Sequence, residues 1–116
     1  MVKQIKRGDI VILNFDPQIG SEQGEIRPAV VLQNDISNKY SSTTIVAPLT
    51  SQLFKKDYPT NVFISKASSK LKKDSNVLLN QIKTIDKSRI KRKICSLDYQ
   101  TMMKIDLAIK VSLGLD

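Results

Sequence analysis

The chain has 116 residues, of which 41% are hydrophobic and 26% charged, and its net charge is +8. This length and composition suit one folded domain, over residues 1–116, and are too apolar for disorder. No apolar run approaches the roughly 18 residues of a membrane helix, no signal peptide is evident, and the single Cys95 excludes an internal disulfide, so we expect a cytoplasmic protein without a membrane partner.

Six apolar, β-branched segments separated by turn residues predict strands. They cover Asp9–Phe15, Pro28–Gln33, Thr43–Leu49, Thr60–Ile64, Ser75–Ile82 and Arg92–Leu97. Because Pro48 has no N–H to donate, it predicts an edge or a bulge near the end of the third strand. Short strands at this spacing indicate an antiparallel barrel or sandwich.

The C-terminal segment has a different pattern, which predicts a helix. Asp98 suits the N-cap, and Gly114 lies where a helix commonly ends. Between them an apolar stripe recurs at helical spacing and is expected to pack over the barrel. Its members are Met102, Ile105, Ile109 and Leu113. Four other residues are assigned to the core: Phe15, Phe63, Cys95 and Met103.

The positive charge is concentrated between positions 51 and 97, where twelve lysines and arginines accompany three acids. A basic segment beside a nearly neutral remainder favours a polyanionic partner, either a nucleic acid or an acidic protein. A solvated basic surface has the same composition, so this alternative stays open. The connection Asp16–Ile26 is long for a link between strands, and loops of that length are often functional.

Several chemistries lack the residues they need. The chain has no histidine, which excludes paired-histidine ribonuclease chemistry and Ser-His-Asp hydrolysis. Its acids are scattered and it has no phosphate-binding glycine motif, so we expect no metal and no cofactor. RNA cleavage remains open, because RNA carries its own nucleophile, the 2′-hydroxyl. An arginine can then stabilise the phosphate charge, and a threonine hydroxyl can add a neutral hydrogen bond.

Four blocks, spread over nearly the whole chain, resemble the MazF/PemK toxin family, and most closely its Gram-positive type. They are Arg7-Gly8-Asp9; Gly20-Ser21-Glu22-Gln23-Gly24 with Arg27-Pro28-Ala29-Val30-Val31; Ile45-Val46-Ala47-Pro48-Leu49-Thr50; and Leu78-Leu79-Asn80-Gln81-Ile82-Lys83-Thr84-Ile85-Asp86. The second block is the most specific, since Gly-Ser-Glu-Gln followed by Arg-Pro before a strand seldom occurs by chance.

The resemblance implies a mainly β fold, a small SH3-like antiparallel barrel with a C-terminal α-helix. It implies a homodimer that acts as the toxin of a type II toxin–antitoxin system. The activity implied is sequence-specific, metal-independent cleavage of single-stranded messenger RNA, with 2′,3′-cyclic phosphate and 5′-hydroxyl ends. A cognate MazE-like antitoxin with an acidic tail would block it.

The resemblance also implies roles for individual residues. Arg27 matches a catalytic arginine that stabilises charge and has a possible part in proton transfer, and Thr50 matches a catalytic threonine that hydrogen-bonds the scissile phosphate. RNA-binding roles fall on Glu22, Gln23, Ser51, Lys55, Lys56 and Gln81. Pro48, Asn80 and Lys83 depart from the family pattern near the expected base-reading surface, which leaves the RNA motif open.

Two other functions fit the same residues. A toxin of similar fold can inhibit DNA gyrase without catalysis, and a plain RNA-binding barrel would bind RNA without cutting it. Structural roles are also open for the two catalytic candidates: Arg27 can be a surface arginine that ends a loop, and Thr50 can simply end a strand.

Overall fold

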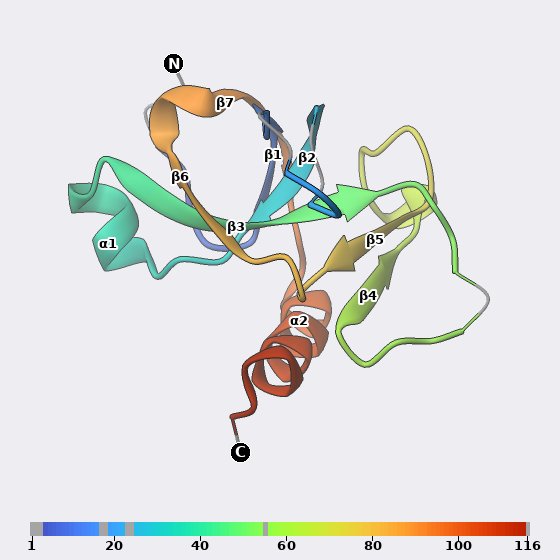
Figure 1. The fold of residues 1–116 in the computed structure, drawn as a ribbon. Coiled ribbons are helices and arrows are strands. Elements are labelled where there is room, and N and C mark those ends of the chain that lie inside the picture. The colour runs from blue at the N-terminus through green and yellow to red at the C-terminus, as the bar shows by residue number, and fades with distance from the viewer. Residues whose placement is uncertain (1–3, 17–18, 23–24, 55, 116) are drawn as a thin grey trace.

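The computed structural model describes residues 4–16, 19–22, 25–54 and 56–115. Seven strands precede a long C-terminal helix, and short helices interrupt the strands (Figure 1). The strands are β1 (Asp9–Asn14), β2 (Ile26–Val31), β3 (Thr43–Thr50), β4 (Asn61–Ile64), β5 (Ser75–Leu78), β6 (Lys83–Asp86) and β7 (Ile90–Ser96). The helices are α1 (Asp35–Tyr40), the 3-10 turns η1 (Lys66–Ser68) and η2 (Lys87–Arg89), and α2 (Tyr99–Leu113).

Strand β3 belongs to two antiparallel sheets. The larger sheet has the order β6-β3-β2-β1-β7 and curls around the centre of the molecule, and the smaller one has the order β3-β5-β4 (Figure 1). This architecture confirms the predicted mainly β, antiparallel fold with a C-terminal helix. None of the helices in the described residues is long and apolar enough to cross a membrane.

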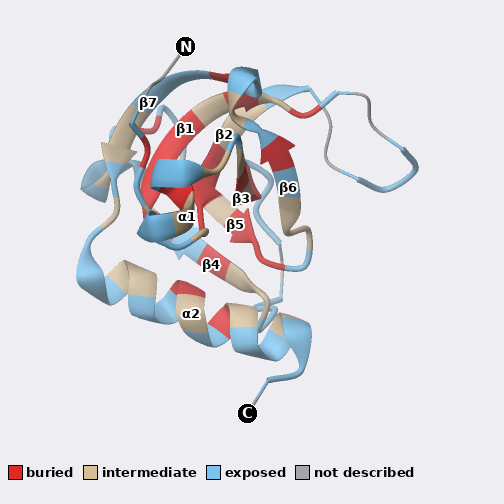
Figure 2. Ribbon diagram, turned by 90° about the vertical axis from the view of Figure 1, so that its left-hand side faces the viewer, coloured by how far each residue is buried: buried red, intermediate tan, exposed pale blue. Residues whose placement is uncertain are grey.

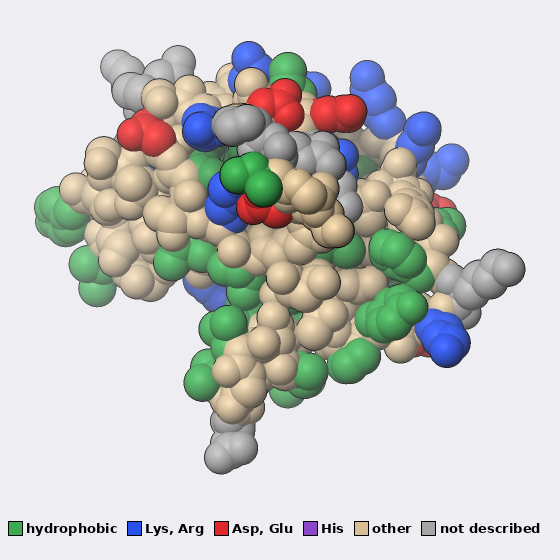
Figure 3. All heavy atoms as spheres, viewed as in Figure 1, with side chains coloured by type: hydrophobic (Ala, Val, Ile, Leu, Met, Phe, Trp, Pro, Cys, Tyr) green, Lys and Arg blue, Asp and Glu red, His purple; other side chains and the backbone are tan. Residues whose placement is uncertain are grey.

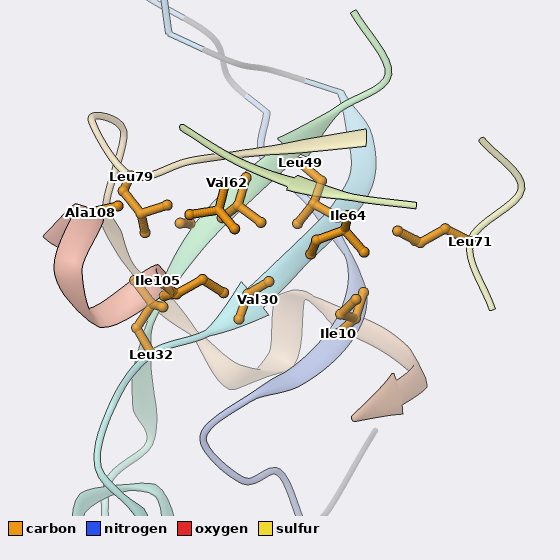
Figure 4. Packing of buried hydrophobic residues seen from close by; sticks show 12 residues of the cluster. Ile10, Val30, Leu32, Leu49, Val62, Ile64, Leu71, Leu79, Ile105 and Ala108 are labelled. Carbon is orange, nitrogen blue, oxygen red and sulfur yellow. The ribbon is translucent and has the colours of Figure 1, made fainter. Parts of the chain in front are cut away.

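The apolar runs of β1 and β2 are buried on both sides of the larger sheet. Ile10 and Val30 face one cluster, together with Ile105 and Ala108 of α2, and Val11 and the other alternate residues face a second cluster. Because successive side chains of a strand point to opposite faces, continuous apolar runs fit strands covered on both sides. Figure 2 shows α2 lying beneath the buried strands, and Figure 4 shows Ile105 and Ala108 among the strand residues.

Helix α2 begins and ends where the sequence predicts. Asp98 is its N-cap, where Oδ1 accepts a hydrogen bond from the backbone N–H of Thr101 at 2.7 Å. Gly114 follows its last turn with a φ of 72°, a left-handed conformation that glycine adopts without strain. An ion pair between Arg7 and Asp106 fastens the helix to the barrel, and Arg7 Nε also donates to the carbonyl of Leu32 at 2.9 Å.

Three core assignments are wrong. Phe63 is 55% exposed, because its neighbours Val62 and Ile64 point into the core and strand alternation turns Phe63 outward. Met103 is 50% exposed and Leu113 is 59% exposed, since the buried face of α2 is centred on Ile105 and Ala108. Phe15 is buried as expected, and Cys95 is half-buried against the core.

Two elements differ from the predicted pattern. The apolar segment Ser75–Ile82 is not one strand: β5 ends at Leu78, and a turn leads to β6, which the sequence did not indicate. The short helix α1 was also not predicted; Asn34 caps it by accepting from the backbone N–H of Ser37.

Pro48 does not lie in an edge strand, so that part of the prediction is wrong. On one side β3 pairs with β2, where Pro48 is opposite Ala29. On its other side β3 pairs with β6 as far as Val46 and with β5 from Leu49 onward. Pro48 therefore stands between two partner strands, where its missing N–H breaks no ladder.

The cap of α2 makes stability depend on pH. Hydrogen bonds from the hydroxyl and the backbone N–H of Thr101 lower the pKa of Asp98 below its ordinary value of 3.8. A group whose pKa is lowered by folding stabilises the fold above its unfolded pKa, and this contribution is lost as the pH falls through the folded pKa.

We expect Asp98→Ala to lower the melting temperature by a few degrees at pH 7, and we expect the difference from the wild type to shrink below pH 3.8. Asp98→Asn keeps a hydrogen-bond acceptor, so its melting temperature should lie between those of the wild type and Asp98→Ala. The cap of this variant should contribute little pH dependence, because an amide does not titrate. Thermal unfolding followed by circular dichroism measures this, and a difference that persists unchanged in acid would contradict it.

Candidate functional site

A cleft of about 450 Å³, called here the basic cleft, lies where β1, β2, the end of β3 and β7 meet the loop between β4 and β5. Its floor is apolar, with Ile12, Pro28 and Leu49 among the contributors. Its polar lining residues are Arg27, Thr50, Ser51, Lys70, Lys72, Lys73, Ser75 and Arg92. Three sequence-predicted site residues, Arg27, Thr50 and Ser51, therefore share one cleft.

The register between β2 and β3 brings the two predicted catalytic residues together. The β2–β3 ladder runs as far as Ala29 and Pro48, and Arg27 and Thr50 each lie two residues beyond that last pair, one on each strand. Half-buried Arg27 reaches across to β3, where its Nη1 donates to the carbonyl of Leu49 at 3.3 Å. Thr50 Oγ1 accepts from the backbone N–H of Gln52 at 3.1 Å, and an accepting hydroxyl still has its own proton to donate.

The electrostatics of the basic cleft are one-sided. Five cations line it, one from β2, three from the β4–β5 loop and one from β7, and its described lining includes no carboxylate. The two ion pairs among the described residues, Arg7–Asp106 and Lys93–Asp9, lie elsewhere. The lining offers guanidinium, ammonium and hydroxyl donors, which suit the oxygens of a phosphate.

A second hollow, called here the loop cleft, adjoins the basic cleft along β3. It measures about 460 Å³ and lies between the long β1–β2 loop and the turn from β5 to β6. It brings together two predicted RNA-binding residues, Glu22 and Gln81, and all three positions that depart from the family pattern. Its lining residues are Phe15, Ser21, Glu22, Pro48, Asn80, Gln81, Ile82 and Lys83. Glu22 also closes a turn of its own loop, since Oε1 accepts from the backbone N–H of Ile19 at 3.1 Å.

Hydrogen bonds close the base of the β1–β2 loop. The backbone N–H of Phe15 donates to the carbonyl of Glu25 at 2.9 Å, and the N–H of Glu25 donates to Asp16 Oδ1 at 2.8 Å. Arg89 Nη1 adds a bond to the carbonyl of Asn14 at 3.3 Å. Gly20 has a φ of 57°, so the glycine does supply the left-handed conformation that the loop requires. Gly24 lies outside the described residues.

The remaining predicted residues are placed differently. Lys56 lines a separate cleft, the aromatic cleft, with Phe54, Tyr58 and Phe63, and it does not join Arg27. Gln23 and Lys55 lie outside the described residues. Sequence reasoning missed four cations of the basic cleft: Lys70, Lys72, Lys73 and Arg92. The charge count over positions 51–97 pointed to this segment, but not to which of its cations converge.

A family model described as the PemK-like, MazF-like toxin of type II toxin–antitoxin systems matches residues 6–113. The chain belongs to this family. A curated endoribonuclease MazF from Staphylococcus epidermidis is 48% identical over 112 residues, which are 97% of this chain and 93% of that protein. These matches confirm the predicted resemblance and the predicted class, an endoribonuclease toxin of a toxin–antitoxin system.

Solved structures support the same fold. MazF from Deinococcus radiodurans superposes with a TM-score of 0.81 at 28% identity, covering 96% of this chain and 97% of that one. An endoribonuclease from Mycobacterial species, solved in complex with its cognate antitoxin, superposes with a TM-score of 0.80 at 21% identity and covers 97% and 98%. At that lower identity the likeness concerns the fold alone.

Proposed function

We propose that this toxin cleaves single-stranded messenger RNA without a metal ion, at a phosphate bound between Arg27 and Thr50. The observation that carries the proposal is the cross-strand placement of these two residues in a cleft lined by five cations, with no carboxylate among its described lining residues. A metal-dependent nuclease needs clustered oxygen ligands, whereas this donor set binds phosphate oxygens directly.

The reaction follows from the chemistry of RNA. The 2′-oxygen of the nucleotide before the scissile bond attacks phosphorus, the bond to the 5′-oxygen breaks, and a 2′,3′-cyclic phosphate and a 5′-hydroxyl remain. Negative charge grows on the equatorial oxygens in the transition state, where Arg27 stabilises it and the Thr50 hydroxyl donates a hydrogen bond. The 2′-hydroxyl loses a proton and the 5′-oxygen gains one. Arginine exchanges protons with difficulty, so we expect turnover to be slow beside that of histidine ribonucleases.

Base recognition is assigned to the loop cleft, next to this phosphate. The amides of Asn80 and Gln81, the Glu22 carboxylate and the Lys83 ammonium offer donors and acceptors to the edge of an unpaired base, and half-buried Ile82 adds an apolar surface. Gln23, in the same loop sequence, is expected to contribute. Ser51, Lys55 and Lys56 are expected to hold the RNA on either side without reading its sequence.

The toxin is also proposed to act as a homodimer, through an apolar surface formed by β4 and α2. Phe63, Leu107 and Val111 line one hollow between these elements and are all more than half exposed. Figure 3 shows hydrophobic side chains gathered over the region of α2 and β4. A patch that joins two elements favours a self-complementary contact. A MazE-like antitoxin with an acidic tail would block RNA binding by occupying the basic cleft.

The first test concerns catalysis. Arg27→Ala should lower cleavage of a long single-stranded RNA in EDTA by at least about 100-fold, because the transition state loses its principal positive charge. Thr50→Ala should lower it about 10-fold or more, Thr50→Ser should recover most of the loss, and Thr84→Ala, an exposed threonine on β6, should change nothing. Gel analysis and end-mapping measure rates and end groups.

Intact RNA in the presence of wild-type protein, at both low and moderate salt, would contradict the proposed function. Binding without any cut product would identify a plain RNA-binding barrel instead. Wild-type activity in folded Arg27→Ala would contradict the assigned residue.

The second test concerns base choice. Asn80→Ala and Lys83→Ala each remove polar atoms from the loop cleft, and neither residue lines the basic cleft. We therefore expect each variant to cleave a broader or different set of RNA sequences. Cleavage by each variant should still be lost when Arg27 is also changed to alanine. Sequencing of RNA ends shows the sites. Thr84→Ala, next to Lys83 but outside the loop cleft, is the control. If Asn80→Ala and Lys83→Ala both cleave the same sequences as the wild type, the loop cleft does not recognise bases.

The third test concerns assembly. Leu107→Glu places a charge on a residue that is 63% exposed in the proposed interface, and it should convert a dimer into a monomer at micromolar concentration. Ile36→Glu, on α1 and 76% exposed, makes the same change on another surface and should leave the dimer intact. Sedimentation measures both, and a monomeric wild type would rule out the dimer.

A further inference from the structure

We propose that Arg92, together with Lys72 and Lys73, binds the RNA phosphate next to the scissile one, so that the basic cleft is a track for the RNA backbone. The inference rests on the proposed ribonuclease function and adds cations that lie outside the sequence motifs. Arg92 comes from β7, near the end of the chain, and the two lysines come from the β4–β5 loop.

The register of the larger sheet places Arg92 relative to the Arg27 site. Ile12 on β1 is paired with Pro28 on β2 and with Arg92 on β7. Residues directly opposite in antiparallel strands share a face, so these three form one row across the sheet. Two strand spacings separate the ends of the row by about 10 Å, and Arg27 adjoins Pro28. The two guanidinium groups thus start from well-separated positions and suit different phosphates of one strand.

The lysines line the cleft because a buried leucine and a hydrogen bond hold the β4–β5 loop in place. Leu71 is buried in the main core, beside Ile64 in Figure 4, and exposed Lys70 and Lys72 flank it. Asp74 Oδ1 accepts from the backbone N–H of Lys66 at 2.8 Å and closes the loop. Basic side chains gather at this corner of the surface in Figure 3, over the loop between β4 and β5. The anchored loop therefore keeps its lysines together along one side of the basic cleft.

The surrounding charges favour a polyanion over an internal ion pair. Lys93, next to Arg92 in β7, is paired with buried Asp9 at 3.3 Å, whereas Arg92 lines the cleft, whose described lining lacks a carboxylate. Crowded cations repel one another unless a ligand neutralises them. Lysine and arginine side chains commonly contact the phosphates of nucleic acids, and Pro28, at the far end of the row from Arg92, is next to Arg27 in β2. RNA phosphates are therefore the occupant we assign, rather than an acidic peptide.

The test measures binding separately from cleavage. The probe is a single-stranded RNA with one 2′-deoxynucleotide at the mapped cut site, which removes the nucleophile, and its Kd is measured between about 50 and 200 mM salt. Arg92→Gln should weaken binding about fivefold at the lowest salt and reduce the slope of log Kd against log salt by about 0.7, the value for one phosphate contact in a single strand. Arg92→Lys should restore the slope.

Lys91→Gln is the matched control. It removes the same charge from the neighbouring residue, which is exposed, lies where the β1–β7 register shifts and is absent from the cleft lining, so it should leave the slope unchanged. With cleavable RNA, Arg92→Gln should raise KM about fivefold and leave kcat and the cleaved sites unchanged, because the scissile phosphate still meets Arg27 and Thr50.

Three results would overturn the inference. Wild-type affinity and slope in folded Arg92→Gln would show that no phosphate binds there. Equal losses in Arg92→Gln and Lys91→Gln would show an effect of net charge alone. A loss of binding to a polyglutamate peptide, with RNA binding unchanged, would assign the surface to an acidic protein partner. A wild type that binds the probe but never cuts cleavable RNA contradicts the proposed function instead.

Discussion

Hydrogen bonds between β2 and β3 pair Ala29 with Pro48 and Val30 with Ala47, and everything at the site depends on this register. Arg27 and Thr50 each lie two residues beyond the Ala29–Pro48 pair, and both line the basic cleft. A slip of one residue would turn each side chain of β2 to the other face and expose residues that two core clusters now bury. The same packing that stabilises the barrel therefore brings the Arg27 guanidinium and the Thr50 hydroxyl to one cleft.

The change of partner along β3 explains why two clefts adjoin. Its first half pairs with β6 and its last residues pair with β5, with Pro48 between them. Pro48 lines the loop cleft, while Leu49 and Thr50 line the basic cleft. One strand thus contributes to both the proposed base-binding hollow and the proposed phosphate site, so the two proposed sites lie side by side.

Sequence patterns predict the parts of this fold that depend on local order. Continuous β-branched runs gave the strands buried on two faces, and the caps of α2 were visible as Asp98 and Gly114. Strand β6 is not evident in the sequence because apolar Leu79 and Ile82 stand on both sides of the polar turn residues and prolong the apolar segment of β5. Phe63 resembles a core residue by type, but strand alternation with Val62 and Ile64 turns it outward. Arg27 and Thr50 came from family resemblance. The cations of the β4–β5 loop and β7 meet only through long-range pairing, which no local pattern contains.

The basic cleft also shows how the fold tolerates a local electrostatic cost. Five cations around one cleft destabilise the folded chain through mutual repulsion, and the described lining of the cleft contains no carboxylate. The fold offsets this with uncharged anchors: Leu71, buried in the core between Lys70 and Lys72, and Ile12 of β1, which is the cross-strand partner of Arg92. A bound polyanion relieves the repulsion, so the free energy stored in the empty cleft contributes to binding. For this reason we expect the proposed acidic antitoxin tail and the proposed RNA substrate to compete for this surface.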